Sequence, residues 1–189
     1  MTITPWDQST KTLQRLAWII TMITFCGGIG IGIWRGSWTS RAVTVHVTAQ
    51  PVVALWMHNA SVVLLAFLGI LSLGLVTWFI VLWNGIDFGY IAMVVVQRYG
   101  AWVMLGGVLP HGIFEIPADL IAFQADIFCL GTMARGVLHR CANSPDGSMN
   151  IMPALRLAAK RNLVSLAILG VAAIIEAFVT PVILQRLLH

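Results

Sequence analysis

The sequence predicts an all-α fold, a polytopic membrane helix bundle that forms a single integral membrane domain over residues 1–189. Hydrophobic residues make up 59% of the chain and charged residues only 10%, against roughly 25% charged residues in an ordinary soluble domain. So few charges cannot cover the surface of a soluble monomer. About five apolar runs also approach the ~20 residues that a helix needs to cross a bilayer. These observations exclude a soluble enzyme and a disordered chain.

The first predicted span covers residues 16–34, which contain no charged side chain and follow a short basic segment. This apolar run is too long and too rich in glycine for a cleaved signal peptide, so we expect a retained helix. Gly28, Gly32 and Gly36 recur at every fourth residue, a spacing that lets two helices approach closely. We expect this glycine face to pack within the chain, with dimerisation as the alternative.

An external loop is expected over residues 35–56, where alternating valine and threonine indicate a short strand. A second span over residues 62–83 follows a more polar stretch that includes Asn59. Asn84 and Gly85 come directly after this span, and the Asn-Gly pair is typical of a tight turn.

The third predicted span, residues 88–110, contains Gln97 and Gly100 near its middle and ends at Pro110. It is predicted either as one continuous helix or as a helix broken between Gln97 and Gly100. A fourth span, residues 112–134, begins directly after this proline, because proline cannot donate the hydrogen bond that a continuing helix requires.

A polar cytoplasmic loop is expected over residues 135–162, and the fifth span covers residues 163–185 with Pro181 near its end. Within the loop, residues 151–162 place leucine and alanine opposite arginine and lysine. This pattern predicts a short helix that lies in the membrane interface.

The positions of lysine and arginine predict the orientation in the membrane, because these residues gather on the cytoplasmic side. Five crossings put seven of them on one side, namely Lys11, Arg15, Arg135, Arg140, Arg156, Lys160 and Arg161. Three fall on the other side, namely Arg35, Arg41 and Arg186. We therefore expect a multi-pass protein of the cytoplasmic membrane with its N-terminus inside and its C-terminus outside the cell.

Five ionisable residues fall within the predicted spans: Arg98, Glu115, Asp119, Asp126 and Glu176. Each costs about 2.5–3.5 kcal/mol at the centre of a membrane helix, so each should face protein or water. The fourth helix carries three of these acids, Glu115, Asp119 and Asp126. Together with His111 they share one stripe about 80° wide on the helix surface. The stripe predicts a polar seam between the third, fourth and fifth helices, either a relay or path for an ion or substrate, or a network that fixes helix packing.

Two groups are expected along this seam. Arg98 and Asp126 lie at similar predicted depths, so we expect a buried ion pair between them. His111 lies at the outer mouth of the seam, and Glu115, Asp119 and Glu176 lie in the outer halves of their spans. Together these four residues form the expected intramembrane polar cluster. His111, Glu115 and Glu176 could ligate a metal ion, but no H-E-x-x-H or comparable pattern supports this reading. We expect neither a metal ion nor another cofactor.

Residues 109–118 read Leu-Pro-His-Gly-Ile-Phe-Glu-Ile-Pro-Ala and contain Pro110, Gly112 and Pro117. This run resembles the P-H-G-x-x-E-x-P-A motif of the stage II sporulation protein M family of integral membrane proteins. Further matches follow in order: Asn59 before an apolar helix, Asn84 and Gly85 in an N-G-x-x-x-G turn, and Glu176 and Pro181 in an I-E-x-F-x-x-P run. Asp119 and Asp126 depart from the family, which has apolar or small residues there.

The resemblance implies a bacterial or archaeal multi-pass protein of the cytoplasmic membrane. It also implies a link to the family's sporulation member, a scaffold that holds peptidoglycan-degrading enzymes together. Other relatives of the family occur beside transporter components or take part in the export of bacteriocins. We therefore expect a non-enzymatic scaffold or anchor. The alternative is a transport or export component whose His111–Glu115–Glu176 cluster handles a proton, an ion or a peptide, and an intramembrane hydrolase is a third possibility.

The expected partners are membrane lipid and proteins, either cell-wall hydrolases or components of an ABC-type transporter. A homo-oligomer is compatible with the glycine face. No nucleic acid is expected, because the membrane orientation accounts for the excess of 11 lysines and arginines over 7 acids.

Overall fold

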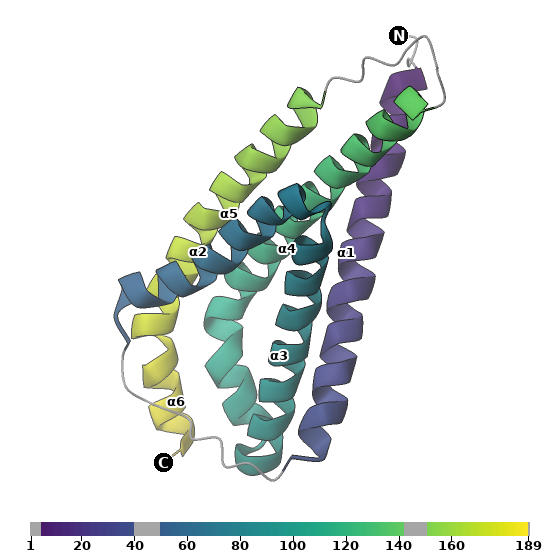
Figure 1. Cartoon of the computed structure of the whole chain (residues 1–189). Helices are drawn as coiled ribbons and strands as arrows, with labels where there is room; N and C mark the ends of the chain where they lie inside the picture. The colour runs from purple at the N-terminus through teal and green to yellow at the C-terminus, as the bar shows by residue number, and fades with distance from the viewer. Residues whose placement is uncertain (1–4, 40–49, 142–150, 189) are drawn as a thin grey trace.

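The computed structural model describes residues 5–39, 50–141 and 151–188, and these residues form helices joined by short turns (Figure 1). The elements are α1 (Pro5–Ser37), α2 (Val52–Leu68), the 3₁₀ helix η1 (Gly69–Ser72), α3 (Leu75–Tyr99), α4 (Ala101–Cys141), α5 (Met152–Phe178) and α6 (Thr180–Leu188). No strand occurs in the described ranges. The predicted all-α class is confirmed. The valine–threonine alternation for which a strand was predicted lies outside the described residues.

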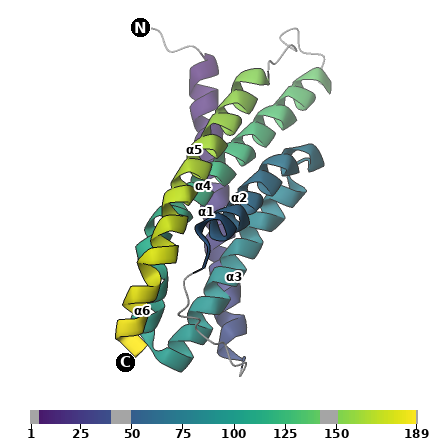
Figure 2. The ribbon, with the colours of Figure 1, turned by 90° about the vertical axis from the view of Figure 1, so that its left-hand side faces the viewer.

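The helices run along one bundle in alternating directions, and the two ends of the chain lie at opposite ends of it (Figures 1 and 2). α1 packs most extensively against α3, and α4 packs against α5. Four described segments are long and apolar enough to cross a membrane: Thr10–Ser37, Val52–Ser72, Leu75–Tyr99 and Met152–Leu188. The architecture is that of a membrane helix bundle, with the more polar α4 packed among these segments.

Facing rows of glycines bring α1 and α3 into backbone contact: Gly28, Gly32 and Gly36 on α1, and Gly85 and Gly89 on α3. A Cβ atom at Gly32 would collide with the backbone of Ile86 and Tyr90, and one at Gly85 would collide with the backbone of Phe25. Glycine is therefore required on both helices for this close packing.

The turn predicted at Asn84 and Gly85 is wrong, because both residues lie inside α3. The chain instead reverses at Leu73 and Gly74, which have φ angles of 53° and 84°. Glycine is common at tight turns and also at close helix contacts, and at Gly85 the second role applies. The predicted second span, residues 62–83, consequently joins the end of α2 to the start of α3.

The helix boundary predicted at Pro110 and Gly112 is also wrong, because α4 continues through Pro110 and Pro117. The chain reverses at Gly100, which has a φ of 90° and separates α3 from α4. This is where the sequence indicated the alternative break in the third span. Prolines inside membrane helices are tolerated because neighbouring side chains and helices satisfy the freed backbone groups.

The separate interfacial helix predicted over residues 151–162 is wrong, because these residues form the first turns of the continuous helix α5. Ala154 and Ala158 are buried against Ala17 of α1 and Ala125 of α4. This face of α5 therefore packs on the bundle, where an interfacial helix would place it against lipid. The predicted loop also shortens, since α4 extends to Cys141.

Candidate functional site

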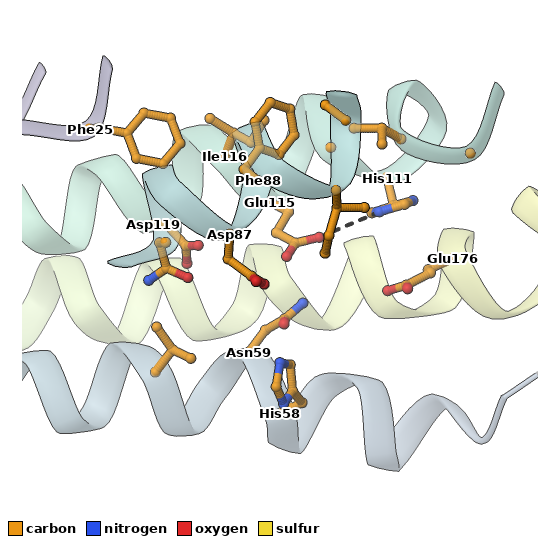
Figure 3. A pocket seen from close by; sticks show the side chains of 17 residues that line it. Phe25, His58, Asn59, Asp87, Phe88, His111, Glu115, Ile116, Asp119 and Glu176 are labelled. Carbon is orange, nitrogen blue, oxygen red and sulfur yellow. Dashed lines mark ion pairs between the residues drawn. The ribbon is translucent and has the colours of Figure 1, made fainter. Parts of the chain in front are cut away.

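A polar cavity of about 370 Å³ lies among α2, α3, α4 and α5 (Figure 3). Each helix contributes polar side chains to its wall: His58 and Asn59 from α2, Asn84 and Asp87 from α3, His111, Glu115 and Asp119 from α4, and Glu176 from α5. A second hollow of about 450 Å³ shares five of these residues and extends to Gln50 and Ala54. The cavity thus opens toward the beginning of α2.

Helical spacing explains why α4 supplies most of the polar wall. His111, Glu115 and Asp119 are four residues apart, so their side chains emerge on one face of α4 in successive turns. The same rule places Asn84 and Asp87, three residues apart, on one face of α3. All five residues line the cavity.

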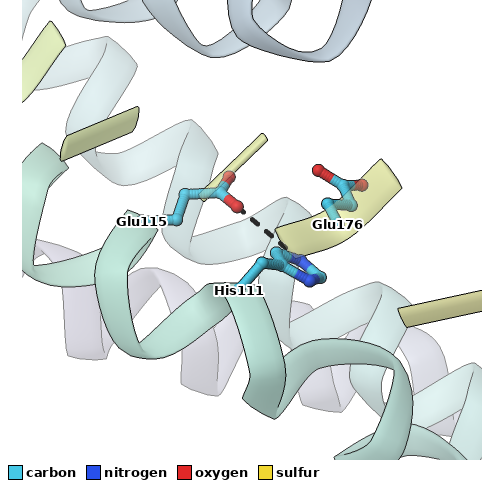
Figure 4. Close-up of side chains that lie close together, drawn as sticks. All are labelled: His111, Glu115 and Glu176. Carbon is cyan, nitrogen blue, oxygen red and sulfur yellow. Dashed lines mark ion pairs between the residues drawn. The ribbon is translucent and has the colours of Figure 1, made fainter. Parts of the chain in front are cut away.

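His111, Glu115 and Glu176 form the closest cluster in the cavity wall (Figure 4). His111 Nε2 lies 3.7 Å from Glu115 Oε2, and the other ring nitrogen, Nδ1, lies 3.3 Å from Thr180 Oγ1. One potential ligand atom from each of the three residues lies within 4.8 Å of the others. Side chains from the first half of α4 and the end of α5, about 60 residues apart in sequence, therefore converge on one point.

The charges lining the cavity are unbalanced. Asp87, Glu115, Asp119 and Glu176 contribute carboxyl groups, whereas no lysine or arginine lines the cavity among the described residues. Asp119 Oδ1 is buried and has no hydrogen-bond partner among them. A carboxylate in a low-dielectric site is strongly disfavoured unless a cation or a proton compensates it. The cavity is therefore suited to positively charged groups.

Apolar side chains close the cavity on the side of the N-terminus. Phe25, Leu120 and Phe123 are buried in one cluster, and Ala122 and Leu169 belong to a neighbouring one. These residues separate the cavity from Asp126 further along α4. In the described part of the chain, the cavity has the form of a pocket that does not continue to the far end of the bundle.

A second buried polar group lies beyond this apolar layer. Asn162 Nδ2 donates hydrogen bonds to Asp126 Oδ1 at 2.8 Å and to the carbonyl of Ala158 at 2.9 Å. Arg161 donates to the side-chain oxygen of Gln124. Asp126 Oδ2 and Asn162 Oδ1 are buried without a hydrogen-bond partner in the structure. This group fixes the packing of α4 against α5.

The ion pair predicted between Arg98 and Asp126 requires correction. Arg98 lies exposed in the last turn of α3, and its guanidinium group stacks over the Tyr99 ring at 5.5 Å from the centroid. Arg98 lies three residues before α4 begins at Ala101. Asp126 lies 25 residues beyond Ala101, about 37 Å along the axis of α4, and is therefore far from Arg98. The prediction failed because it placed Arg98 in the middle of a span, whereas the chain reverses at Gly100.

Three polar residues that line the cavity or lie buried in the bundle were not predicted from the sequence. His58 and Asp87 line the cavity. Asp87 lies three residues after Asn84, so helical spacing would have placed both on one face of α3. Asn162 is 3% exposed and lies on the buried face of α5. A lone asparagine next to a predicted span boundary carries no such indication.

The family model for stage II sporulation protein M matches residues 21–181. The chain belongs to this family. The protein is therefore a membrane protein of the stage II sporulation protein M family, as its sequence motifs and apolar helices indicate. Within the family's motifs, the structure places His111 and Glu115 of the first run and Glu176 of the last run in one cavity wall.

Two archaeal relatives from Methanocaldococcus jannaschii are similar to this member of the stage II sporulation protein M family. The uncharacterized protein MJ0793 is 30% identical over 132 residues, which cover 69% of this chain and 71% of that protein. The uncharacterized protein MJ0706 is 26% identical over 130 residues, which cover 68% of this chain and 55% of that protein. This chain thus spans about half the length of MJ0706. No solved structure matches.

The other motif residues of the stage II sporulation protein M family occupy different positions from those predicted. Asn59 and Asn84 line the cavity, and Gly112 lies in its wall. Gly85 packs on α1, and Pro181 is the second residue of α6. Asp126, which departs from the family's usual residue, lies outside the cavity and contacts Asn162.

Proposed function

We propose that the protein is a non-enzymatic, multi-pass component of a transport or export system in the cytoplasmic membrane. In this proposal its cavity binds a positively charged group, either an ion, a proton or a cationic part of a transported peptide. The observation that supports it is the cavity wall with four acids and no lysine or arginine among its lining residues. A wall of this composition attracts cations and repels anions.

The position of the opening supports an outward-facing site. The hollow reaches Gln50 and Ala54 at the beginning of α2, toward the end of the bundle that carries Arg35 and Arg186. If the N-terminus is cytoplasmic, this end faces the exterior. The cavity would then receive its cation from outside, or release it there.

The test replaces Glu115 and Glu176 together by glutamine, which keeps the side-chain volume and removes both charges. Cells that lack the native protein are supplied with the wild type, with the double variant or with Asp126→Asn, all at equal membrane levels. Exported peptides and cellular ion contents are then compared by mass spectrometry. We expect the double variant to resemble the deletion strain and Asp126→Asn, whose carboxyl lies outside the cavity, to resemble the wild type. A double variant that restores the wild-type profile would refute the transport role.

A scaffold or anchor for partner proteins is the second candidate, and one observation favours it. The last turns of α4 expose Val137 and Leu138, at 61% and 69%, beyond the basic residue Arg135. Basic residues gather at the membrane surface, so apolar side chains beyond Arg135 would lie outside the hydrocarbon of the bilayer. There they can contact a protein partner. Affinity purification from native membranes, with Val137→Ser and Leu138→Ser as a paired variant, distinguishes the two roles. A scaffold loses an identified cell-wall hydrolase in this variant, whereas a transport component retains its ABC-type partner.

A further inference from the structure

We infer that the cavity binds one divalent first-row transition-metal ion, Zn²⁺ or Mn²⁺, through His111, Glu115 and Glu176. This inference rests on the proposed function, because the metal ion is the cation that the cavity takes up. It goes beyond that function by naming the class of ion and the three side chains that hold it.

The geometry brings three suitable donors to one point. An imidazole nitrogen and two carboxylate oxygens lie within 4.8 Å of one another, on two helices that are packed together (Figure 4). Donor atoms around a tetrahedral ion are about 3.4 Å apart, given metal–ligand distances near 2.0–2.1 Å. The 3.7 Å separation of His111 Nε2 and Glu115 Oε2 already approaches this value. Metal binding requires the Glu176 carboxylate to move closer to the other two donors than the 4.8 Å limit within which all three now lie.

A further contact orients the histidine. Nδ1 of His111 lies 3.3 Å from Oγ1 of Thr180, a buried residue at the start of α6. A proton on Nδ1 that is donated to this hydroxyl leaves the lone pair of Nε2 directed toward Glu115. Histidines that ligate metals are usually held by such a contact from their other nitrogen.

The charge favours a divalent ion over a monovalent one. Two glutamate carboxylates carry a charge of −2, which one M²⁺ ion neutralises completely. A monovalent ion would leave one negative charge uncompensated in a wall that contains no lysine or arginine among the described residues. Protonation of both glutamates would also give a neutral site, and the binding experiment separates that outcome from metal binding.

The donor types narrow the choice of metal. Imidazole suits zinc and other transition metals, whereas calcium and magnesium take oxygen ligands almost entirely. Carboxylates suit manganese and also bind zinc. Three protein ligands leave a coordination position open toward the cavity, where Asn59 and Asp87 also line the wall.

The experiment measures metal binding by the full-length protein in lipid nanodiscs after removal of bound metal with a chelator. Zn²⁺ and Mn²⁺ are titrated separately by equilibrium dialysis with elemental analysis. We expect one ion per chain in the wild type and a loss of affinity of at least about 10-fold in His111→Ala and in Glu176→Gln. Thr180→Val should weaken binding less than removal of a ligand. Asp126→Asn should bind as the wild type does.

Spectroscopy gives a second readout for any variant that folds poorly. Co²⁺ bound by the wild type should show the intense visible bands of a tetrahedral site, and Glu176→Gln should shift or abolish them. The inference is overturned if the wild type binds no stoichiometric metal, or if His111→Ala and Glu176→Gln bind it as tightly as the wild type. If metal binding fails while the double glutamine variant still loses export in cells, the metal assignment is wrong and the transport role stands.

Discussion

At the scale of single residues, the acids inside the bundle form two groups that differ in how their charges are compensated. Asp126 accepts a hydrogen bond from Asn162, with both side chains at most 3% exposed. Glu115 and Glu176 instead face a cavity, where a mobile cation can reach them. The first arrangement stabilises the fold and the second leaves a site available for a ligand.

Asn162→Leu is expected to destabilise the protein, because it removes the donor to Asp126 and leaves a buried carboxyl group without a partner. The expected loss is about 1–3 kcal/mol in the free energy of unfolding. Thermal unfolding in detergent, followed by circular dichroism, measures it. The double variant Asp126→Leu, Asn162→Leu removes both partners and should recover part of the loss. Equal destabilisation of the double and single variants would contradict this role.

At the scale of helices, the stability of the α1–α3 pair depends on which glycine is replaced. A Cβ atom at Gly32 would collide with the α3 backbone, whereas one at Gly30 has no atom within 4 Å. Gly32→Ala should therefore destabilise the fold by about 1–3 kcal/mol or more, since overpacking displaces the backbone. Gly30→Ala should be neutral or stabilise by up to about 1 kcal/mol, because alanine favours helix. Unfolding midpoints in one detergent compare the two, and similar values would contradict the packing described.

The same glycines show why the sequence predicted the elements only in part. The first span lies within α1 because an uncharged run bounded by basic residues has few alternatives. Gly85 was ambiguous, because a sequence does not reveal whether the missing side chain permits a turn or the approach of α1. Helical periodicity alone predicted the stripe of His111, Glu115 and Asp119. The partner of Asp126 could not be predicted in this way, because the prediction required knowing that α3 ends at Tyr99. The local sequence pattern was sufficient to predict which face of a helix is polar. Tertiary contacts decided where each helix begins and ends.

At the scale of the whole molecule, the basic residues divide between the two ends of the bundle. Lys11 and Arg15 lie in the first half of α1, Arg135 lies in the last turns of α4, and Arg156, Lys160 and Arg161 lie in the first half of α5. These three parts of the helices are at the end of the bundle where the chain begins (Figure 1). Among the described residues, Arg35, Arg98 and Arg186 belong to the last turns at the opposite end. The greater number at the first end favours a cytoplasmic N-terminus.

We therefore predict five crossings, made by α1, by α2 with η1, by α3, by α4 and by α5 with α6. Reporter fusions after His189 and within residues 144–148 should lie on opposite sides of the membrane, with the second in the cytoplasm. An insertion near Gln50 serves as a control and should lie outside. Finding the first two reporters on the same side would refute the five-crossing arrangement.

The interruptions in α4 and between α5 and α6 have a mechanical consequence. Pro110 and Pro117 each remove one backbone hydrogen bond from α4, and Pro181 follows the junction between α5 and α6. On the far side of these points, Val103 of α4 and Leu184 of α6 pack with Val95 of α3 in one small cluster. The outer turns of α4 and α6 are therefore held against α3 by side-chain packing. Glu176 lies on one side of the α5–α6 junction and Thr180 on the other, so a bend at this junction alters the separation between Glu176 and the His111–Thr180 pair. Binding of a ligand by these residues and the angle at the junction are then thermodynamically linked, and each must bias the other by the same free energy.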